Sequence, residues 1–217
     1  MEFPHPPAAA RAGLDRLTAS HGAFARIEAD AGPLPWRRRT PGFAGLLQAI
    51  MGQQISNQAA GAIWRRLAVL PGALTPNGLL ALEDDALRGA GLSRPKVAHS
   101  RSLAAAYADG RLDDDRIASM GDDEAIATIC AVRGLGPWTA EVYLLFALER
   151  PDIFPAGDIA LTGAFAHLHG LAARPDTAAM RVIARAWSPH RSLAARLLWH
   201  HWRHTTGRPA MDDMPIG

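Results

Sequence analysis

Apolar residues recur along the chain mostly at intervals of three and four, the spacing that places them on one side of an α-helix. No segment shows a convincing alternation of apolar and polar β-branched residues, which would be typical of a strand. The pattern therefore predicts an all-α fold. Helices are expected at residues 8–20, 22–31, 43–52, 57–70, 76–90, 94–109, 123–132, 137–148, 159–169, 176–187 and 189–204.

Capping residues mark some of these boundaries. Ser56 is well placed to cap the helix that follows it, because a serine oxygen accepts from the first N–H groups of a helix. Ser188 and Pro189 similarly predict the start of the last helix, since proline at the first helical position has no N–H to lose. The remaining acidic and terminal segments are expected to be connectors or loose ends: Asp113–Asp115, Asp122–Asp123 and the tail after Gly207.

Composition narrows the setting in which this helical protein acts. The 217 residues are 48% hydrophobic, which is ample for a buried core. A net charge of +2 with a pI near 9.2 is compatible with nucleic acid but does not require it. The single cysteine, Cys130, excludes an intramolecular disulfide and a cysteine-held iron–sulfur cluster. Without a leader-like start or a long apolar window, we expect a cytoplasmic protein that does not contact membranes.

Two glycines flank one apolar residue at Gly134-Leu135-Gly136, between two predicted helices. Glycine allows positive φ and a close approach of another backbone, while Leu135 can plug between the helices. The N–H groups that begin the second helix then form a site for a phosphate oxygen. The pattern predicts a phosphate-binding hairpin at 133–137, although an ordinary glycine-capped corner has the same glycines.

Asp158 follows the Gly- and Pro-containing loop 154–157 and directly precedes an apolar helix. It is a natural N-cap, at a position where the helix dipole and the backbone N–H groups favour a negative charge. Capping alone would explain such an aspartate. The hairpin about one helix upstream makes Asp158 a candidate for catalysis as well.

Together these segments resemble the helix-hairpin-helix DNA glycosylase superfamily, in which a Gly-x-Gly hairpin precedes a Gly/Pro-rich loop and a catalytic aspartate. Within it, the chain looks most like the DNA-3-methyladenine glycosylase II branch of alkylation-repair enzymes. Three further segments match in order, and the resemblance extends from about Phe43 to Trp202. They are Ile50–Ser56 with the family's Gly-Gln-x-x-Ser corner, Leu92–Lys96 with its Gly-hydrophobic-Ser-x-x-Lys segment, and Trp187–Ser192 with its Trp-x-Pro-Trp-Arg-Ser helix start.

The resemblance implies one glycosylase module over residues 1–217, built from two helical subdomains that flank a cleft. One subdomain, at about 43–150, contains the hairpin, and the other combines about 1–42 with 151–217. The implied partner is double-stranded DNA containing damaged bases, which the protein binds as a monomer at the bacterial nucleoid.

The resemblance also implies a monofunctional reaction. Bifunctional relatives place a nucleophilic lysine two residues after the second hairpin glycine, where this chain has Trp138, and its only lysine is Lys96. We therefore expect hydrolysis of the flipped base without strand cleavage, with ionised Asp158 stabilising the oxocarbenium-like sugar. No second carboxylic acid is evident to protonate the leaving base, which fits a cationic alkylated purine that departs without that help.

Residues around the base and the DNA follow from the family pattern. Trp138 and Trp199 are expected to line an aromatic base pocket, because a cationic base attracts aromatic rings. The tyrosine expected four residues after Trp138 is replaced by Val142, with Tyr143 beside it. Gln54 is expected to fill the gap that the flipped base leaves. The expected DNA-contacting residues are Gln53, Gln54, Gly134, Leu135, Gly136 and Thr139.

No cofactor is expected to be required, and no metal is assigned from side chains. Some members of the family hold a monovalent ion on hairpin carbonyls, which leave no side-chain signature. His200, His201 and His204 include an i, i+4 pair, but no third zinc ligand has an obvious spacing. We interpret the three histidines as a solvated or groove-facing surface.

Three alternatives stay open. The first is a glycosylase of the same fold acting on oxidised or mismatched bases, although the missing hairpin lysine argues against the oxidised-guanine type. The second is a noncatalytic DNA-binding module, which would not need Asp158. The third is a purely structural helical bundle, which would show no salt-sensitive DNA binding.

Overall fold

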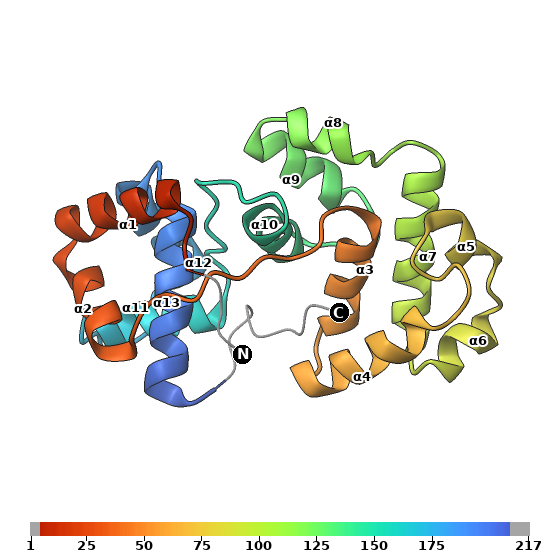
Figure 1. Cartoon of the computed structure of the whole chain (residues 1–217), viewed down its shortest axis with the longest axis horizontal. Helices are drawn as coiled ribbons and strands as arrows, with labels where there is room; N and C mark the ends of the chain where they lie inside the picture. Colours follow the sequence, from red (N-terminus) through yellow and green to blue (C-terminus); the bar gives the residue numbers. More distant parts are fainter. Residues whose placement is uncertain (1–4, 209–217) are drawn as a thin grey trace. The chain divides into compact units, whose positions relative to one another are not determined.

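The computed structural model describes residues 5–208, and these residues form helices joined by loops, without any strand (Figure 1). The all-α prediction is confirmed. The start of the chain through residue 4, and the predicted loose end from residue 209 on, lie outside the described residues. Among the helices of the described part, none is both long and apolar enough to cross a membrane.

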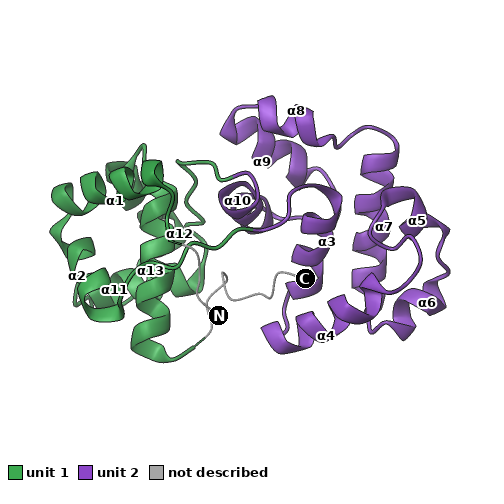
Figure 2. Ribbon diagram, in the orientation of Figure 1, with its two compact units in different colours: residues 1–38, 149–213 green, residues 39–148, 214–217 purple. Residues whose placement is uncertain are grey.

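The chain divides into two compact units (Figure 2). Unit 1 contains the residues up to Arg38 together with those from Glu149, and unit 2 runs from Arg39 to Leu148. The sequence predicts the boundaries between the two subdomains near 42/43 and 150/151. Asp158 therefore belongs to unit 1, and the Gly134–Gly136 hairpin belongs to unit 2.

Unit 2 is organised around α3, whose apolar residues are buried on nearly every side. Leu46, Leu47 and Ile50 have no exposed surface, and α3 packs against α4, α7 and α10. A helix that is apolar all round is stable only when neighbours surround it. The helices of unit 2 are α3 (Gly42–Gly52), α4 (Asn57–Ala68), α5 (Pro76–Ala81), α6 (Asp84–Gly89), α7 (Arg94–Ala108), α8 (Asp114–Ser119), α9 (Asp122–Cys130) and α10 (Pro137–Phe146).

Three predictions for unit 2 are wrong, one of them the connector expected at Asp122–Asp123, which forms the start of α9. The helix expected at 76–90 is broken after α5, because the Arg101 side chain donates to the carbonyl of Leu82 at 2.6 Å and ends the helix there. The acidic connector at Asp113–Asp115 instead starts α8, since Asp113 accepts from the Arg116 N–H at 2.8 Å as an N-cap. The expected cap at Ser56 is confirmed, with its oxygen 3.2 Å from the Ala59 nitrogen.

Unit 1 is assembled around α13, the longest helix of the unit, which packs against α1, α2 and α11 (Figure 1). Its residues Ala194, Leu197, Leu198 and Trp199 have no exposed surface. Spacings of one, three and four bring a broad apolar face toward the other helices. The elements of unit 1 are α1 (Ala8–Ser20), α2 (Gly22–Ala31), α11 (Ile159–Leu168), α12 (Thr177–Ala184), the 3₁₀ helix η1 (Arg185–Trp187) and α13 (Arg191–Thr206).

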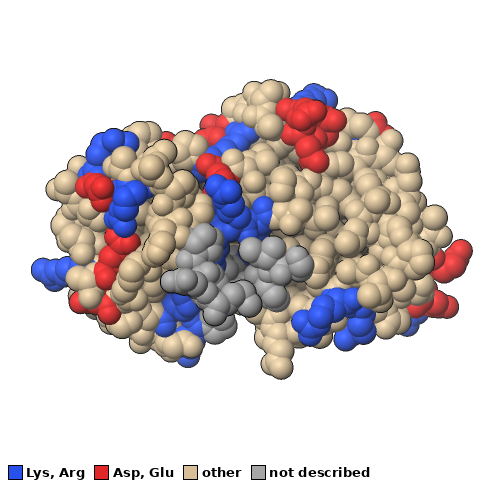
Figure 3. All heavy atoms as spheres, in the orientation of Figure 1, with Lys and Arg blue, Asp and Glu red and all other residues tan. Residues whose placement is uncertain are grey.

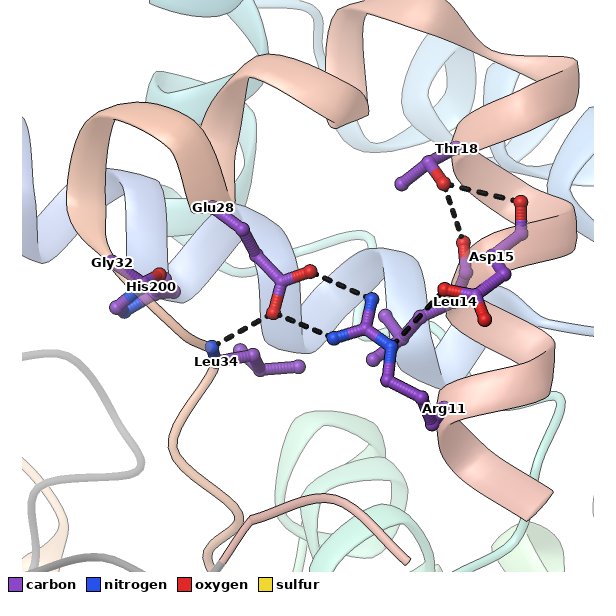
Figure 4. A network of polar contacts seen from close by, with 8 residues as sticks. All are labelled: Arg11, Leu14, Asp15, Thr18, Glu28, Gly32, Leu34 and His200. Atoms are coloured by element: carbon purple, nitrogen blue, oxygen red, sulfur yellow. Dashed lines mark hydrogen bonds and ion pairs between the residues drawn. The ribbon is translucent and has the colours of Figure 1, made fainter. Parts of the chain in front are cut away.

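A polar network joins α1 to α2 and to the loop that follows α2 (Figure 4). The Arg11 guanidinium donates to both carboxylate oxygens of Glu28, at 2.9 and 2.7 Å. Glu28 also accepts from the Leu34 N–H at 2.9 Å. The bond to Arg11, against the opposing effect of burial, lowers the pKa of Glu28. Two parallel bonds between planar groups fix the angle between the helices better than a single contact would.

The last helix starts later than predicted. Ser188 was expected to cap it, but its hydroxyl donates to Asp152 at 2.7 Å, and α13 begins at Arg191. The Asp152 carboxylate instead accepts from the Arg191 backbone N–H at 3.1 Å and from its guanidinium at 2.9 Å. A residue 39 positions upstream therefore caps the helix, a partner that local sequence does not reveal.

The histidines of α13 are mostly buried, so the solvated or groove-facing surface predicted for all three does not include His200 and His201. His200 is 8% exposed and its Nε2 lies 2.9 Å from the Gly32 carbonyl oxygen, while His201 is 5% exposed. Nδ1 of His167 lies 3.0 Å from Nε2 of His201. His204 is exposed. His200 and His201 therefore join α13 to the end of α2 and to α11.

The His201 side chain makes unit 1 sensitive to acid. Burial lowers the pKa of His201 below its ordinary value of 6.5, and the charges of His167, His204 and His200 lower it further. Asp30 has an opposing effect. Just below that value the unfolded chain binds a proton at this position and the folded chain does not. Lowering the pH therefore favours unfolding.

We expect the Tm of the protein to fall as the pH is lowered through 6.5. In a chain of this size, each kcal/mol of stability that is lost lowers the Tm by roughly 2–4 °C. Thermal unfolding of the wild type and of His201→Gln on both sides of this pH measures the effect, and the variant should change less. His169→Gln, at an exposed histidine of the same unit, is the control. An equal acid effect in His201→Gln would contradict the assignment.

Candidate functional site

The predicted hairpin is present between α9 and α10. Gly134 adopts a φ of +96°, and the Leu135 N–H donates to the Val132 carbonyl at 3.1 Å. Leu135 is 4% exposed, as expected for the plug between two helices. Gly136 is the N-cap residue of α10, and Pro137 occupies its first turn. The motif is therefore a helix-hairpin-helix, as the sequence predicts.

The two hairpin glycines are needed for different reasons. A Cβ at Gly134 would lie 2.3 Å from Cγ of His99, so this glycine is required by positive φ and by internal packing. At Gly136, φ is −99° and a Cβ would meet no atom within 4 Å. The protein itself leaves room at Gly136, next to the N–H groups that begin α10. Such a position can admit a phosphate oxygen.

The corner between α3 and α4 contacts the hairpin directly. Gln53 donates from Nε2 to the Gly134 carbonyl at 2.9 Å and lies 3.5 Å from the Thr139 hydroxyl. Thr139 is 4% exposed, so its side chain serves this internal contact. Gln54 is exposed and has a φ of +58°, which is unusual for a residue with a side chain. The corner therefore presents Gln54 outward while Gln53 anchors it.

In unit 1, Asp158 is the N-cap of α11, as predicted. Its Oδ1 accepts from the Leu161 backbone N–H at 2.9 Å and from Nε1 of Trp199 at 3.3 Å. Its own N–H donates to the Pro155 carbonyl at 2.9 Å, which closes the loop before the helix. The side chain is 7% exposed. Two donors on one oxygen hold the carboxylate in a defined orientation.

Trp199 was predicted to line the base pocket, but its side chain is not accessible to a base. It has no exposed surface, and its indole N–H donates to Asp158. An aromatic ring that stacks on a bound base needs at least one accessible face. The contact between Trp199 and Asp158 could not be predicted from local sequence, because the two residues are 41 positions apart. The one available signal is that the N–H of a buried tryptophan needs an acceptor.

The other two aromatic residues predicted for the base pocket belong to α10. Trp138 is half-buried at the start of the helix, close to the hairpin in sequence. Tyr143 is 3% exposed, and its hydroxyl accepts from the Gly42 N–H at 2.8 Å. Burial raises the pKa of Tyr143. The structure therefore uses Tyr143 inside unit 2, and of the three aromatic residues predicted for the base pocket only Trp138 is not buried.

Charge is distributed unevenly over unit 2. Acidic side chains gather over α8 (Figure 3), where Asp113, Asp114 and Asp115 are exposed. DNA phosphates would be repelled from that face. Exposed guanidinium groups lie on α4 at Arg65, in the hairpin at Arg133 and, beside these aspartates, on α8 at Arg116. Within residues 5–208, no group of three or more His, Cys, Asp or Glu side chains is arranged to hold a metal ion.

The model of the HhH-GPD superfamily base excision DNA repair protein matches residues 47–189. The chain is 28% identical over 158 residues to DNA-3-methyladenine glycosylase 1 of Schizosaccharomyces pombe, covering 71% of this chain and 69% of that protein. It is 27% identical over 192 residues to DNA-3-methyladenine glycosylase 2 of Escherichia coli, covering 83% of this chain and 64% of that one.

A solved structure is similar over most of the chain. It is the 3-methyladenine DNA glycosylase of Schizosaccharomyces pombe in complex with abasic DNA, with a TM-score of 0.78 and 25% sequence identity. The match covers 88% of this chain and 95% of that one. The fold similarity therefore extends well beyond the hairpin.

Proposed function

Because the chain belongs to the HhH-GPD superfamily of base excision DNA repair proteins, we propose that it is a monofunctional DNA glycosylase that excises alkylated purines of the 3-methyladenine type. Several relatives with this activity in their names support the choice of substrate class, including those of Schizosaccharomyces pombe and Escherichia coli. The partner is double-stranded DNA containing damaged bases.

The observation that carries the proposal is the fixed carboxylate of Asp158. The Leu161 N–H and the Trp199 indole N–H both reach its Oδ1, at 2.9 and 3.3 Å. A helix needs only one capping bond from such a residue. The additional donor, from a fully buried side chain of another helix, orients the carboxylate more closely than capping requires. Preorganised charge of this kind is the usual means of stabilising a transition state.

In the proposed reaction, the bond between C1′ of the deoxyribose and the base nitrogen breaks, and the electron pair leaves with the base. The sugar acquires oxocarbenium character, which the negative charge of Asp158 stabilises. The oxygen of a water molecule then bonds to C1′ and releases a proton. An N-alkylated purine already carries positive charge, so it leaves without a second acid. Trp138 stands where a nucleophilic lysine would be needed, so the strand stays intact.

Unit 2 supplies the proposed contacts with the DNA backbone. The open space at Gly136 and the N–H groups of α10 suit a phosphate oxygen. The exposed Arg133 in the hairpin adds a positive charge next to them. Exposed Gln54, held at positive φ, is proposed to fill the gap left by the flipped base, and half-buried Trp138 to contact that base. The buried positions of Tyr143 and Trp199 do not favour a base contact.

No cofactor takes part in this hydrolysis. A monovalent ion on the hairpin carbonyls stays a prediction: the Gly134 and Val132 carbonyls each accept one hydrogen bond, from Gln53 and Leu135, and a carbonyl oxygen has a second lone pair for a cation. We further propose that the protein acts as a monomer, in the cytoplasm, on nucleoid DNA.

Base release from methylated duplex DNA tests the proposed function. We expect the protein to liberate 3-methyladenine or 7-methylguanine, detected by chromatography of the free bases. The DNA strands should stay uncut until alkali is added, because no lysine is available at the hairpin for strand cleavage. Duplex DNA without methylation, treated identically, is the control.

Different failures of this experiment have different meanings. Strand cleavage without alkali would contradict the monofunctional assignment. Salt-sensitive DNA binding without release of any alkylated base would favour a noncatalytic module or a different lesion. The absence of salt-sensitive binding would favour a structural helical bundle.

A further inference from the structure

The helix α7 contacts both segments that we assign to DNA binding in unit 2. It packs against α3, whose end leads into the Gln53–Gln54 corner. Lys96 and His99 are separated by three positions on this helix and therefore lie on one side of it. Neither residue takes part in the chemistry proposed above.

Lys96 holds the end of α3. Its ammonium donates to the carbonyl of Met51, in the last turn of that helix. The last carbonyls of a helix have no partner within the helix, and a positive charge there also complements the helix dipole. Lys96 is 9% exposed, and burial lowers its pKa. A buried ammonium is costly without an acceptor, so this contact locks the two helices together.

His99 contacts the hairpin by packing rather than by a hydrogen bond. Its ring lies so close to Gly134 that a Cβ on the glycine would be 2.3 Å from Cγ of His99 and 2.6 Å from its Cβ. The hairpin backbone therefore rests directly on α7. Gln53 closes the arrangement by bonding to the Gly134 carbonyl at 2.9 Å. The corner and the hairpin are thus linked to each other and, separately, to one rigid helix.

Gln54 benefits most from such support. It follows Met51 by three residues and has a φ of +58°, a conformation that is unfavourable for a residue with a side chain and persists only when its surroundings enforce it. A side chain that enters the stack of DNA bases must be attached to a backbone that is held in place. Two hydrogen bonds, on either side of Gly52, hold this backbone: Gln53 donates to the Gly134 carbonyl, and the Met51 carbonyl accepts from Lys96.

We propose that Lys96 is a positioning residue for base flipping, which acts by capping α3 and holding the Gln54 wedge in place. The proposal rests on the function proposed above, because it assigns Lys96 to one step of that reaction. His99 supports the hairpin from the same side of α7. Lys96 itself contacts neither the base nor the sugar.

The test compares two DNA duplexes that contain the same alkylated base, paired normally in one and placed in an unpaired bulge in the other. Flipping costs least for an unpaired base, so a wedge matters mainly for the paired duplex. We expect Lys96→Met to slow single-turnover base release from the paired duplex about ten- to a hundred-fold, and from the bulge less than about three-fold. Lys96→Arg, which keeps a charged donor, should recover most of the paired rate.

Coupling to Gln54 completes the test. If Lys96 acts through the wedge, Lys96→Met combined with Gln54→Ala should be no slower on the paired duplex than Gln54→Ala alone. Equal slowing of both substrates by Lys96→Met, or additive effects in the double variant, would overturn the positioning role. Should Lys96→Met fail to fold in circular dichroism, Lys96→Gln undergoes the same comparison. Failure of the wild type to release the base from either duplex would refute the proposed function, and the positioning role with it.

Discussion

Asp158→Asn is expected to lower the rate of base release by about 10²–10³-fold or more, the scale on which a preorganised electrostatic group affects catalysis. Asparagine has the same shape as aspartate and is an equally good N-cap. Its oxygen can still accept from the Leu161 N–H and from the Trp199 indole. The variant therefore loses the negative charge beside the developing oxocarbenium ion and keeps the structure around it.

Single-turnover base release and DNA affinity should be measured on the same preparation of Asp158→Asn. We expect affinity for duplex DNA to remain within about two-fold of the wild type, because the carboxylate contributes nothing to phosphate binding. Asp176→Asn is the matched control: Asp176 caps α12 in the same unit, accepting from the Ala179 N–H at 2.8 Å, and is exposed. It should release bases at the wild-type rate. Wild-type activity in Asp158→Asn would disprove the catalytic role.

Gly134→Ala should destabilise the protein by roughly 2–6 kcal/mol, the sum of a strained positive φ and an overpacked contact. At this position φ is +96°, and the new methyl group would lie 2.3 Å from a carbon of His99. Equilibrium unfolding in urea measures the loss of stability, and DNA affinity should fall with the distorted hairpin. Unchanged stability would contradict the packing described here.

Gly136→Ala separates a role in DNA binding from a role in folding. Its φ is −99° and a Cβ would meet no atom within 4 Å, so stability should change by no more than about 0.5 kcal/mol. The methyl group would nevertheless occupy the space in front of the α10 N–H groups. We expect weaker DNA binding in fluorescence anisotropy at constant salt. Wild-type affinity would show that no phosphate approaches this glycine.

Features governed by neighbouring residues were predictable from the sequence. The helical spacing of apolar residues located most helices to within a few residues, and the Ser56 and Asp158 caps are present as expected. A cap, a turn glycine and an apolar stripe all act within about four positions along the chain, so their patterns are legible without a structure. The hairpin is of the same kind, and its glycines and Leu135 lie as predicted.

The errors arose where a distant side chain decides the local structure. Arg101 ends α5, and Asp152 binds the hydroxyl of Ser188 that was expected to cap α13. His200 and His201 are buried because α13 lies at the centre of unit 1, a position that their spacing does not reveal. Many residues of a chain could bond to a given polar group, and the packing of the folded chain decides which of them lies close enough.

By itself, the sequence determined the helical fold, the hairpin, the candidate aspartate and the superfamily, since these depend on residue types at short, fixed spacings. Only the tertiary structure decided which side chains hold these parts in place. In the folded chain, Trp199 donates to Asp158, Lys96 donates to a carbonyl at the end of α3, and His99 packs against the hairpin. Such contacts depend on where whole helices pack, because burial makes each polar group find a partner among residues that folding has brought near.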